Sequence, residues 1–480
     1  MQNTNLNQKS PGFRYLSNDQ IKSIHTTSLE ILDDVGVEVN SEEGRDLLEK
    51  NGCIAEGKLV KIPPGLVEWA INRAPRQILL YDRTGEPKLN LHDYESYFGL
   101  GPTTLNTIDP KTKERRKVQK NDIKKAAKLV DTLDNMDFMM GLGTIDDVPQ
   151  QHSDRHEFEA MVKNTIKPIV AWSYSSKGLQ DVIDMASSVV GGKSTLEEKP
   201  FIVSYSEPAS PLRHDRDGLN KMLLAVENGV PVIYTSGVQG GGTVPATPAG
   251  NLALINAECL SGLVMAQLKK EGAPFLIGGF PTVMDMKTAT TVFGSPEKDR
   301  MAAAYMEIAH WYDLPAWGEA GCSDSKIPDQ QLAITGGISA LVSSLSGANL
   351  IHDTGYLESG KTSSLEAIIL MDEIIDYTNR VMDGIELNEE TMAIDTIRRI
   401  GHGGNYLTDK HTIEHFEQEY WDPTLIDRDG YQNWADKGSK SMRDRINEKM
   451  DRILEEHSPK RLPDSALEKI SEIMDSLEDN

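Results

Sequence analysis

The feature that most constrains the fold is an alternation of short apolar runs and amphipathic helical patterns between about residues 95 and 380. Helical periodicity is clear over 121–134, 251–270 and 364–380. Because consecutive strand–helix units place their strands in parallel, eight of them predict a (β/α)₈ TIM barrel, with a doubly wound open sheet as the alternative. The apolar runs are 96–101, 138–143, 168–174, 201–205, 230–235, 274–280, 314–318 and 348–352.

The segments on either side of this alternation have a different pattern. Before it, Ser17 opens a helical stretch through Val35, and Pro63-Pro64 begins another helix. After it, mixed-charge helical patterns continue to the end of the sequence. We therefore predict an N-terminal helical and strand layer (1–92), a barrel (93–385) and a C-terminal helical extension (386–480), so that the 480 residues form one large domain with additions.

Charge and cysteine content restrict the partners. The chain has 50 Lys+Arg against 74 Asp+Glu, a formal net charge of −24, which disfavours nucleic acid and anionic membranes. It is compatible with a cationic small molecule.

The cysteines and apolar runs indicate the compartment. Cys53, Cys259 and Cys322 are scattered without CxxC spacing, the N-terminus has no apolar signal core, and no apolar run reaches the length of a membrane span. We expect a cytoplasmic protein.

Aromatic residues gather where the predicted strands end, and in a βα barrel those ends build the site. Several aromatic faces around one point form a cage for a quaternary ammonium group. Aromatic residues are also common strand formers, so packing in the core is the alternative. The candidate binding residues are Tyr97, Phe98, Trp172, Tyr174, Tyr205, Tyr234, Gln239, Phe280 and Tyr356, with Trp317 also at a strand end. The candidate catalytic residues are Glu207, Glu319 and His352.

Two histidine pairs have the spacing of ligands on one helix face. They are His152 with His156, and His411 with His415. Neither pair has the HExxH order of zinc peptidases, and exposed helix histidines are the simpler interpretation.

The alternative to an aromatic cation site in the barrel is a metal site or a nucleophile. Cys322 follows the seventh predicted strand, and with His352 and Glu319 it offers either a zinc site or a nucleophile–base pair. A lone cysteine is more often a small packing residue, so we expect no resident metal. The Gly240–Gly242 run lacks the residues that follow in a P-loop and is interpreted as a flexible barrel loop.

Five segments together resemble the trimethylamine methyltransferase (MttB) superfamily, and they span nearly the whole chain. They are LSNDQIKSIHTTSLEILDDVGVEV near the N-terminus, GGGTVPATPAGNLALINAECLSGLVMAQL from Gly240, FGSPEKDRMAAAYMEIAHWYDLPAWGEAGCSDSKIPDQQ from Phe293, GANLIHDTGYLESGKTSSLEAIILMDEII from Gly347 and GHGGNYLTDKHT from Gly401. The resemblance implies a (β/α)₈ barrel that moves a methyl group from a methylated amine to the Co(I) corrinoid of a separate protein. Trimethylamine members carry pyrrolysine, whereas this sequence has only the twenty standard residues.

The chain therefore resembles the non-pyrrolysine branch, which implies a quaternary amine such as glycine betaine, proline betaine, carnitine or γ-butyrobetaine. A quaternary ammonium leaves as a neutral amine without a proton donor, so the absence of an obvious catalytic triad is consistent with this chemistry. A substrate carboxylate has backbone N–H groups, Gln239, His352, or a cation such as Lys326 or Lys361 as candidate partners. His352 is favoured by its place at the end of the eighth strand.

The expected partners and alternatives follow from the same resemblance. We expect no tightly bound cofactor, a corrinoid-binding partner protein and a homo-oligomer, with the GHGGNYL loop and the C-terminal tail as candidate docking elements. The alternatives are a zinc-dependent barrel methyltransferase or hydrolase, and a non-enzymatic betaine-binding protein.

Overall fold

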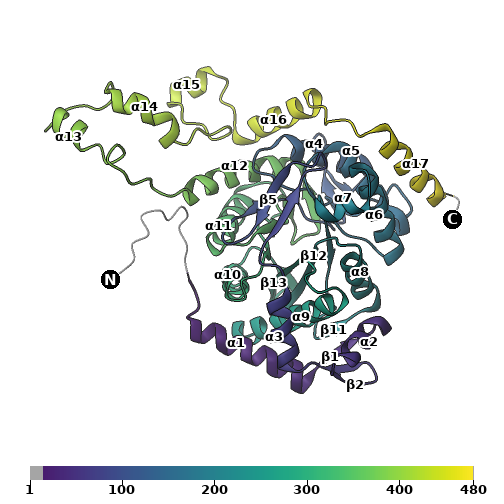
Figure 1. Cartoon of the computed structure of the whole chain (residues 1–480). Helices are drawn as coiled ribbons and strands as arrows, with labels where there is room; N and C mark the ends of the chain where they lie inside the picture. The colour runs from purple at the N-terminus through teal and green to yellow at the C-terminus, as the bar shows by residue number, and fades with distance from the viewer. Residues whose placement is uncertain (1–13, 479–480) are drawn as a thin grey trace.

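Seven parallel strands and a short eighth segment at Phe138 and Met139 form a closed barrel in the computed structural model, which describes residues 14–478 (Figure 1). The polar N-terminus, Met1 to Gly12, lies outside the described residues. The sheet order is β6-β16-β15-β13-β12-β10-β9. Phe138 and Met139 close the ring through parallel bridges to Gly99 and Ile169. The predicted TIM barrel is confirmed, and its named strands are β6 (Tyr97–Phe98), β9 (Ile169–Ala171), β10 (Ile202–Ser206), β12 (Val232–Gly240), β13 (Phe275–Asp285), β15 (Ala316–Glu319) and β16 (Leu350–His352).

The strands differ in detail from the sequence-based boundaries. The second apolar run, residues 138–143, forms only isolated β-bridges at Phe138 and Met139 and no continuous strand. β12 and β13 continue beyond the predicted ends and carry β14 (Thr290–Val292), which pairs antiparallel with β13. The helices outside the ring are α4 (Lys120–Thr132), α5 (Ser153–Asn164), α6 (Ser176–Val190), α7 (Lys193–Glu198), α8 (Arg216–Glu227), α9 (Pro248–Lys269), α10 (Pro296–Trp311), α11 (Gln330–Ser346) and α12 (Leu365–Met382).

An N-terminal layer packs on the outside of the barrel against α9. It contains α1 (Asn18–Glu30), α2 (Glu42–Lys50) and α3 (Pro64–Arg73), which all contact α9. Its sheet is joined to the barrel because β1 (Val37–Val39) pairs with β11 (Arg213–His214) as well as with β3 (Leu59–Lys61), which in turn pairs with β2 (Ile54–Glu56). α9 is long and apolar enough to cross a membrane, but 83% of its apolar window is buried, as expected of a core helix between two layers.

A hairpin closes the N-terminal end of the barrel. It consists of β4 (Ile78–Tyr81) and β5 (Pro87–Leu91). Leu80 and Leu91 are fully buried in one cluster with Val203, Ile233 and Leu350 from the barrel interior. A ligand therefore enters from the other end, where the strands finish and the loops begin.

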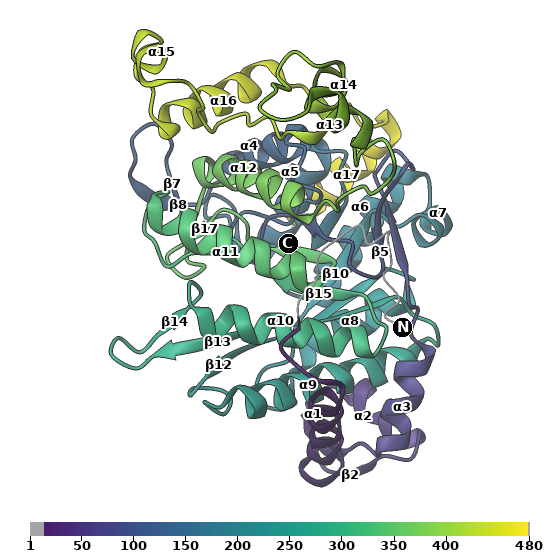
Figure 2. The same cartoon turned by 90° about the vertical axis from the view of Figure 1, so that its left-hand side faces the viewer.

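Small strands and C-terminal helices surround the mouth and the outside of the barrel. β7 (Asn106–Ile108), β8 (Arg115–Lys117), β17 (Tyr356–Leu357) and β18 (Thr362–Ser364) form a sheet from the loops after the first and eighth strands. After α12 come α13 (Ile394–Ile400), α14 (Lys410–Glu419) and α15 (Tyr431–Asp436), which stand away from the barrel. α16 (Met442–Glu456) then packs on α12 and α4, and α17 (Asp464–Glu478) packs on α6 (Figures 1 and 2). The division of the chain at 92 and 385 remains a prediction.

Candidate active site

Strand alternation places one set of side chains inside the barrel and the other against the helices. Along β16, Leu350 belongs to the interior cluster and Ile351 to the outer core. Two residues beyond Leu350, His352 lies on the same inner face. The same alternation aims Trp317 and Glu319 of β15 inward.

An aromatic series crosses the inside of the barrel near its mouth. The ring of Trp317 lies 4.4 Å from that of His352 and 5.9 Å from that of Tyr205, measured between centroids. Phe280 lies 5.8 Å from His352, and Phe138 lies 5.9 Å from Trp317. We call the region of the barrel interior around these rings the lumen. Their faces are suited to a quaternary ammonium group.

Glycines on neighbouring strands leave room for these rings. A Cβ atom at Gly237 would lie 2.3 Å from the ring of Phe280, and one at Gly278 would lie 2.7 Å from Cβ of Trp317. At Gly101 a Cβ would lie 1.9 Å from Oδ1 of Asp353. Larger residues at these positions would displace the groups that line the lumen. Glycine is therefore needed there to make room for these groups.

Four of the predicted binding residues do not line the lumen mouth. Phe98 and Tyr234 lie on the outer face of the strands, and Tyr234 contacts His214 through its hydroxyl group, 2.7 Å from Nδ1. Tyr97 points inward but at the closed end, where its hydroxyl accepts a hydrogen bond from the backbone of Asn90 in the hairpin. Tyr174 is exposed and packs on Trp172 with its ring centroid 4.8 Å away. These assignments are corrected because strand register could not be determined from the sequence.

A buried ion pair holds Glu319. The ammonium of Lys298 on α10 donates to Oε2 of Glu319 and lies 3.0 Å from Oδ1 of Asp299. Burial lowers the pKa of Lys298, but the two carboxylates outweigh that effect and raise it, so the ammonium remains charged. Oε1 of Glu319 is buried and has no hydrogen-bond partner within residues 14–478. This oxygen is available to a ligand in the lumen.

His352 is neutral and has a defined orientation. Burial lowers its pKa to about 4, although the carbonyl of Gly318 opposes the shift. Nδ1 lies 2.8 Å from that carbonyl oxygen. A carbonyl only accepts, so the ring proton is on Nδ1 and Nε2 carries a lone pair. The neutral ring therefore cannot donate from Nε2 to a substrate carboxylate, which argues against the role that the sequence favoured for it.

Asp353 is an acidic group that the sequence-based selection omitted. It follows His352 directly, and its Oδ1 lies 3.6 Å from Nε2 of that ring. Burial raises its pKa to about 7, while Lys298 lowers it. Its φ of +72° is a left-handed conformation that Asp tolerates better than most residues. Its position after a strand-end histidine could have suggested it.

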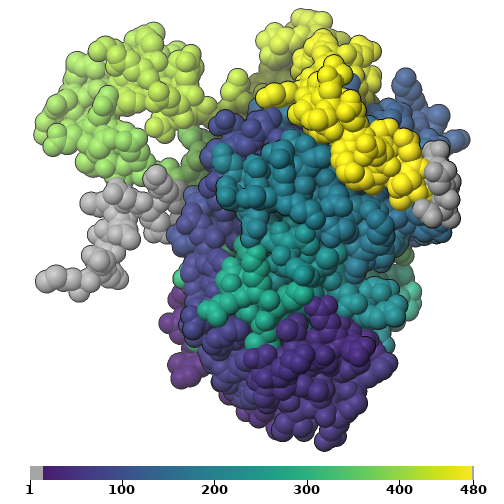
Figure 3. All heavy atoms as spheres, turned by 45° about the vertical axis from the view of Figure 1, so that its right-hand side comes forward, coloured from purple at the N-terminus to yellow at the C-terminus, as the bar shows by residue number. Residues whose placement is uncertain are grey.

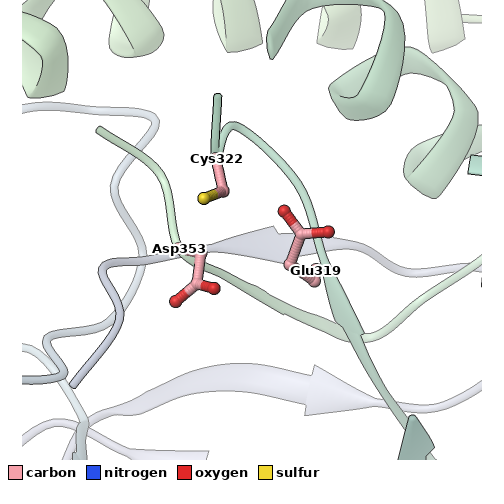
Figure 4. A group of neighbouring side chains, drawn as sticks. All are labelled: Glu319, Cys322 and Asp353. Carbon is pink, nitrogen blue, oxygen red and sulfur yellow. The ribbon is translucent and has the colours of Figure 1, made fainter. Parts of the chain in front are cut away.

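Glu319, Cys322 and Asp353 form a compact acidic group (Figure 4). Their potential ligand atoms lie within 4.8 Å of one another. Burial, together with the neighbouring carboxyl groups, raises the pKa of the Cys322 thiol well above its usual value. A protonated, buried thiol is a poor nucleophile, so covalent catalysis through Cys322 is not supported.

The remaining predicted residues lie around the mouth. Tyr205 donates its hydroxyl to Glu207, with 2.8 Å between the oxygens, and Glu207 is reached by solvent. Gln239 donates to Thr291 of β14, at 2.9 Å. The Tyr356 hydroxyl is buried and has no hydrogen-bond partner within the described chain. These groups surround the lumen with hydroxyl and carboxyl oxygens.

Beside Trp172 lies a second buried carboxyl group, which was not predicted from the sequence. Glu157 of α5 is 1% exposed, and its Oε1 lacks a hydrogen-bond partner within residues 14–478. Burial raises its pKa well above the usual value, and the indole of Trp172 opposes that shift. The sequence placed Glu157 only beside a histidine pair, with no indication that α5 turns it inward.

The histidine pairs do not form sites in the barrel. His152 lies 2.7 Å from a guanidinium nitrogen of Arg155, and His156 lies 2.9 Å from Nζ of Lys120. The rings of His411 and His415 pack against each other on α14 at a tilt of 38°, away from the strands. The expectation of exposed helix histidines is met only in part, because all four are half-buried and His152 ends the 3₁₀ turn Gln150–His152 before α5.

Phe280→Leu should weaken binding of a quaternary ammonium by about 0.5–2 kcal/mol, because one aromatic face is lost. Phe98→Leu is the matched control, since Phe98 lies outside the lumen. Calorimetric titration of both folded variants measures the difference. Equal affinities would remove Phe280 from the cation site.

The closed ring of parallel strands defines the fold class, a TIM barrel, and its strand ends carry the candidate site. The chain belongs to the trimethylamine methyltransferase (MTTB) family, whose profile matches residues 1–479. It is a methyltransferase.

Curated relatives cover almost all of the chain. It is 32% identical to trimethylamine methyltransferase MttB of Desulfitobacterium hafniense (strain DSM 10664 / DCB-2), over 98% of this chain and 95% of the relative. It is 30% identical to the glycine betaine methyltransferase of D. hafniense (strain Y51), over 95% of each chain. The crystal structure of the Methanosarcina barkeri monomethylamine methyltransferase (MtmB) has a TM-score of 0.54 at 12% identity, covering 98% of this chain and 88% of that one, which supports the shared fold.

Proposed function

We propose that this methyltransferase moves a methyl group from a quaternary amine to the Co(I) corrinoid of a separate partner protein. The observation that carries the proposal is the lumen itself, in which Tyr205, Phe280 and Trp317 provide aromatic faces and the acidic group provides negative charge. Glycine betaine, proline betaine, carnitine and γ-butyrobetaine are the candidate substrates. The name of one relative, a glycine betaine methyltransferase, supports this class.

The charges in the lumen favour the ammonium end of such a substrate. Lys298 is the cation nearest to the acidic group, and it is already paired with Glu319 and Asp299. Its ammonium is therefore not free for a substrate carboxylate. Lys326 and Lys361 are exposed, and Lys326 donates to the backbone carbonyl of Asp324. We propose that a betaine enters with its ammonium group first and its carboxylate near Gln239 at the mouth.

Methyl transfer needs little proton chemistry from this chain. The N–CH₃ bond breaks, its electron pair remains on nitrogen as a neutral tertiary amine, and the methyl group becomes methyl-Co(III). The corrinoid, when bound, supplies the strong nucleophile. The chain's residues bind the cation, align the bond and exclude water. The high pKa of Cys322 supports an acceptor from outside the chain.

A corrinoid partner fits the open end of the barrel. β12, β13 and β14 extend beyond the ring at the mouth, and Met286 beside them is 78% exposed. We propose that the corrinoid protein docks over this end, with the GHGGNYL loop of residues 401–407 as a further candidate contact. The hairpin of β4 and β5 excludes the opposite end. A cytoplasmic location is part of this proposal and is consistent with three free, buried cysteines.

The test combines the chain, a reduced corrinoid protein and each of the four betaines, and follows loss of Co(I) and formation of methyl-Co(III). Choline, which has the trimethylammonium group but no carboxylate, measures how much the carboxylate contributes. We expect methyl transfer from at least one betaine. Binding of betaines without any transfer would instead indicate a betaine-binding protein.

A zinc-dependent enzyme is the second candidate function, favoured by the close approach of Glu319, Cys322 and Asp353. The ammonium of Lys298 already contacts Glu319 and repels a divalent cation. Elemental analysis of the purified chain distinguishes the two candidates. About one zinc per chain, with activity lost on chelation, would favour the zinc enzyme.

A further inference from the structure

Residues 385–420 form an arm that is folded into helices but buries none of its apolar side chains. No residue of α13, α14 or α15 is buried. α13 has seven residues and α14 has ten, and isolated helices of this length are marginal in water. Figure 3 shows this part of the chain, in green, standing clear of the barrel. The arm therefore needs a surface to pack on.

One face of α14 is suited to a groove. Ile413 and Phe416 of α14 and its C-cap Tyr420 recur at helical spacing, and they are 61%, 43% and 69% exposed. The arm has internal order, because Arg399 forms an ion pair with Asp409, the N-cap of α14, at 2.5 Å. It thus presents a defined apolar stripe.

The barrel carries a matching apolar groove between α11 and α12. It has a volume of about 540 Å³, and Glu373 is the one acidic or basic residue in its lining. Ile334 and Ile338 of α11 are 61% and 54% exposed, and Tyr377 of α12 is 54% exposed. The Glu373 carboxylate is bonded to the backbone of residues 424–426, so the groove presents no free charge to a helix.

The arm begins beside this groove but leads away from it. α12, one wall of the groove, ends at Met382, and the arm follows directly. The chain returns to α12 at Trp421, whose indole donates to Asp376 at 2.8 Å and packs on Tyr377. Between these points the arm extends outward (Figure 1). Each chain thus carries one apolar arm and one apolar groove, side by side and unpaired.

We propose that two copies of this chain exchange arms, with the apolar face of α14 from each copy lying in the α11–α12 groove of the other. A two-fold axis near residue 385, where each arm begins, would place each arm in the groove of the other copy at the same time, as in isologous dimers. The mode of recognition is an amphipathic helix in an apolar groove. This interface does not depend on the identity of the substrate.

The decisive experiment uses cysteine pairs on separate copies. The native cysteines are buried, so introduced ones react selectively. Differently tagged copies carrying Ile338→Cys and Phe416→Cys are co-expressed and treated with a short bis-maleimide. We expect a crosslinked species containing both tags. Met286→Cys replaces Ile338→Cys in the control pair and should not crosslink, because Met286 does not line the groove. Equal yields from the two pairs, or no crosslink, would overturn the proposal.

The mass in solution provides an independent test. Light scattering of the full chain should give twice the chain mass of 53.1 kDa, or an even multiple of it. Ile338→Asp places a charge in the groove and should halve that mass, whereas Met286→Asp should not. A monomeric wild-type chain would contradict the proposal. So would a crosslink that forms within one chain when both cysteines are placed in it.

Discussion

Lys298→Met lowers the unfolding free energy by about 3–5 kcal/mol, because it leaves the buried carboxylate of Glu319 without a counter-charge. Lys298 is fully buried and Glu319 is 2% exposed, so water cannot replace the lost contact. Urea unfolding followed by tryptophan fluorescence measures the change. Lys326→Met, at an exposed lysine, is the matched control and should change stability by less than about 0.5 kcal/mol.

A double variant separates charge from packing. Lys298→Met combined with Glu319→Gln removes both members of the pair, so much of the lost stability should return. If the double variant is as unstable as the sum of the two single variants, the loss comes from packing and not from an unpaired charge. The ion pair would then not be what positions Glu319.

Asp353 should make binding of a quaternary ammonium depend on pH. Its pKa of about 7 means that most molecules are protonated at pH 6 and ionised at pH 8. If the cation binds the ionised form, affinity rises about tenfold over that interval, and binding releases a proton. Asp353→Asn should remove the pH dependence and lower the affinity at pH 8 about tenfold, or about 1.4 kcal/mol. Calorimetry in two buffers of different ionisation enthalpy measures both effects.

The groups that surround Asp353 have different titration ranges. His352 has a pKa of about 4, and the pKa of the Cys322 thiol is well above its usual value. The other nearby charged or titratable groups are Lys298, Glu319, Glu207, Tyr205 and Tyr356. A pH dependence that persists in Asp353→Asn would assign the titration to one of them.

Asp353 also makes the free energy of unfolding depend on pH. Here the protonated form favours the folded state, whereas cation binding favours the ionised form. A carboxyl in an unfolded chain loses its proton near pH 3.9, whereas Asp353 retains it to about pH 7. The folded state thus holds more protons between these values. The contribution of Asp353 to stability therefore falls as the pH rises from about 4 to 7 and changes little above that. A bound cation should reduce this loss, since it favours the carboxylate.

The barrel was predictable because its strands and helices differ in hydrophobic period. The runs at 201–205 and 348–352 correspond closely to β10 and β16. The ends of β12 and β13 were not predictable, since their pairing with each other and with β14 extends them beyond the apolar runs. The closing hairpin of β4 and β5 was not predicted as part of the barrel, because it lies before the strand–helix series and meets the barrel interior only through tertiary packing.

The site was harder to predict because a sequence does not show which face of a strand is inside. Phe280 and Phe98 both stand near strand ends, yet one faces the lumen and the other the helices. Lys298 was missed because it comes from α10 and meets Glu319 only through tertiary packing. His352 was correctly placed at the end of the last strand, while its tautomer depends on the Gly318 carbonyl. The catalytic and binding roles of these residues remain predictions.

One competition experiment tests the central claim most directly. The chain and a reduced corrinoid protein are supplied with equal concentrations of the four betaines and trimethylamine, and nuclear magnetic resonance quantifies each demethylated product against methyl-Co(III). We predict that a betaine is demethylated in a one-to-one ratio with methyl-cobalt while trimethylamine is retained. Formation of dimethylamine, with all four betaines intact, would contradict a quaternary amine as the methyl donor.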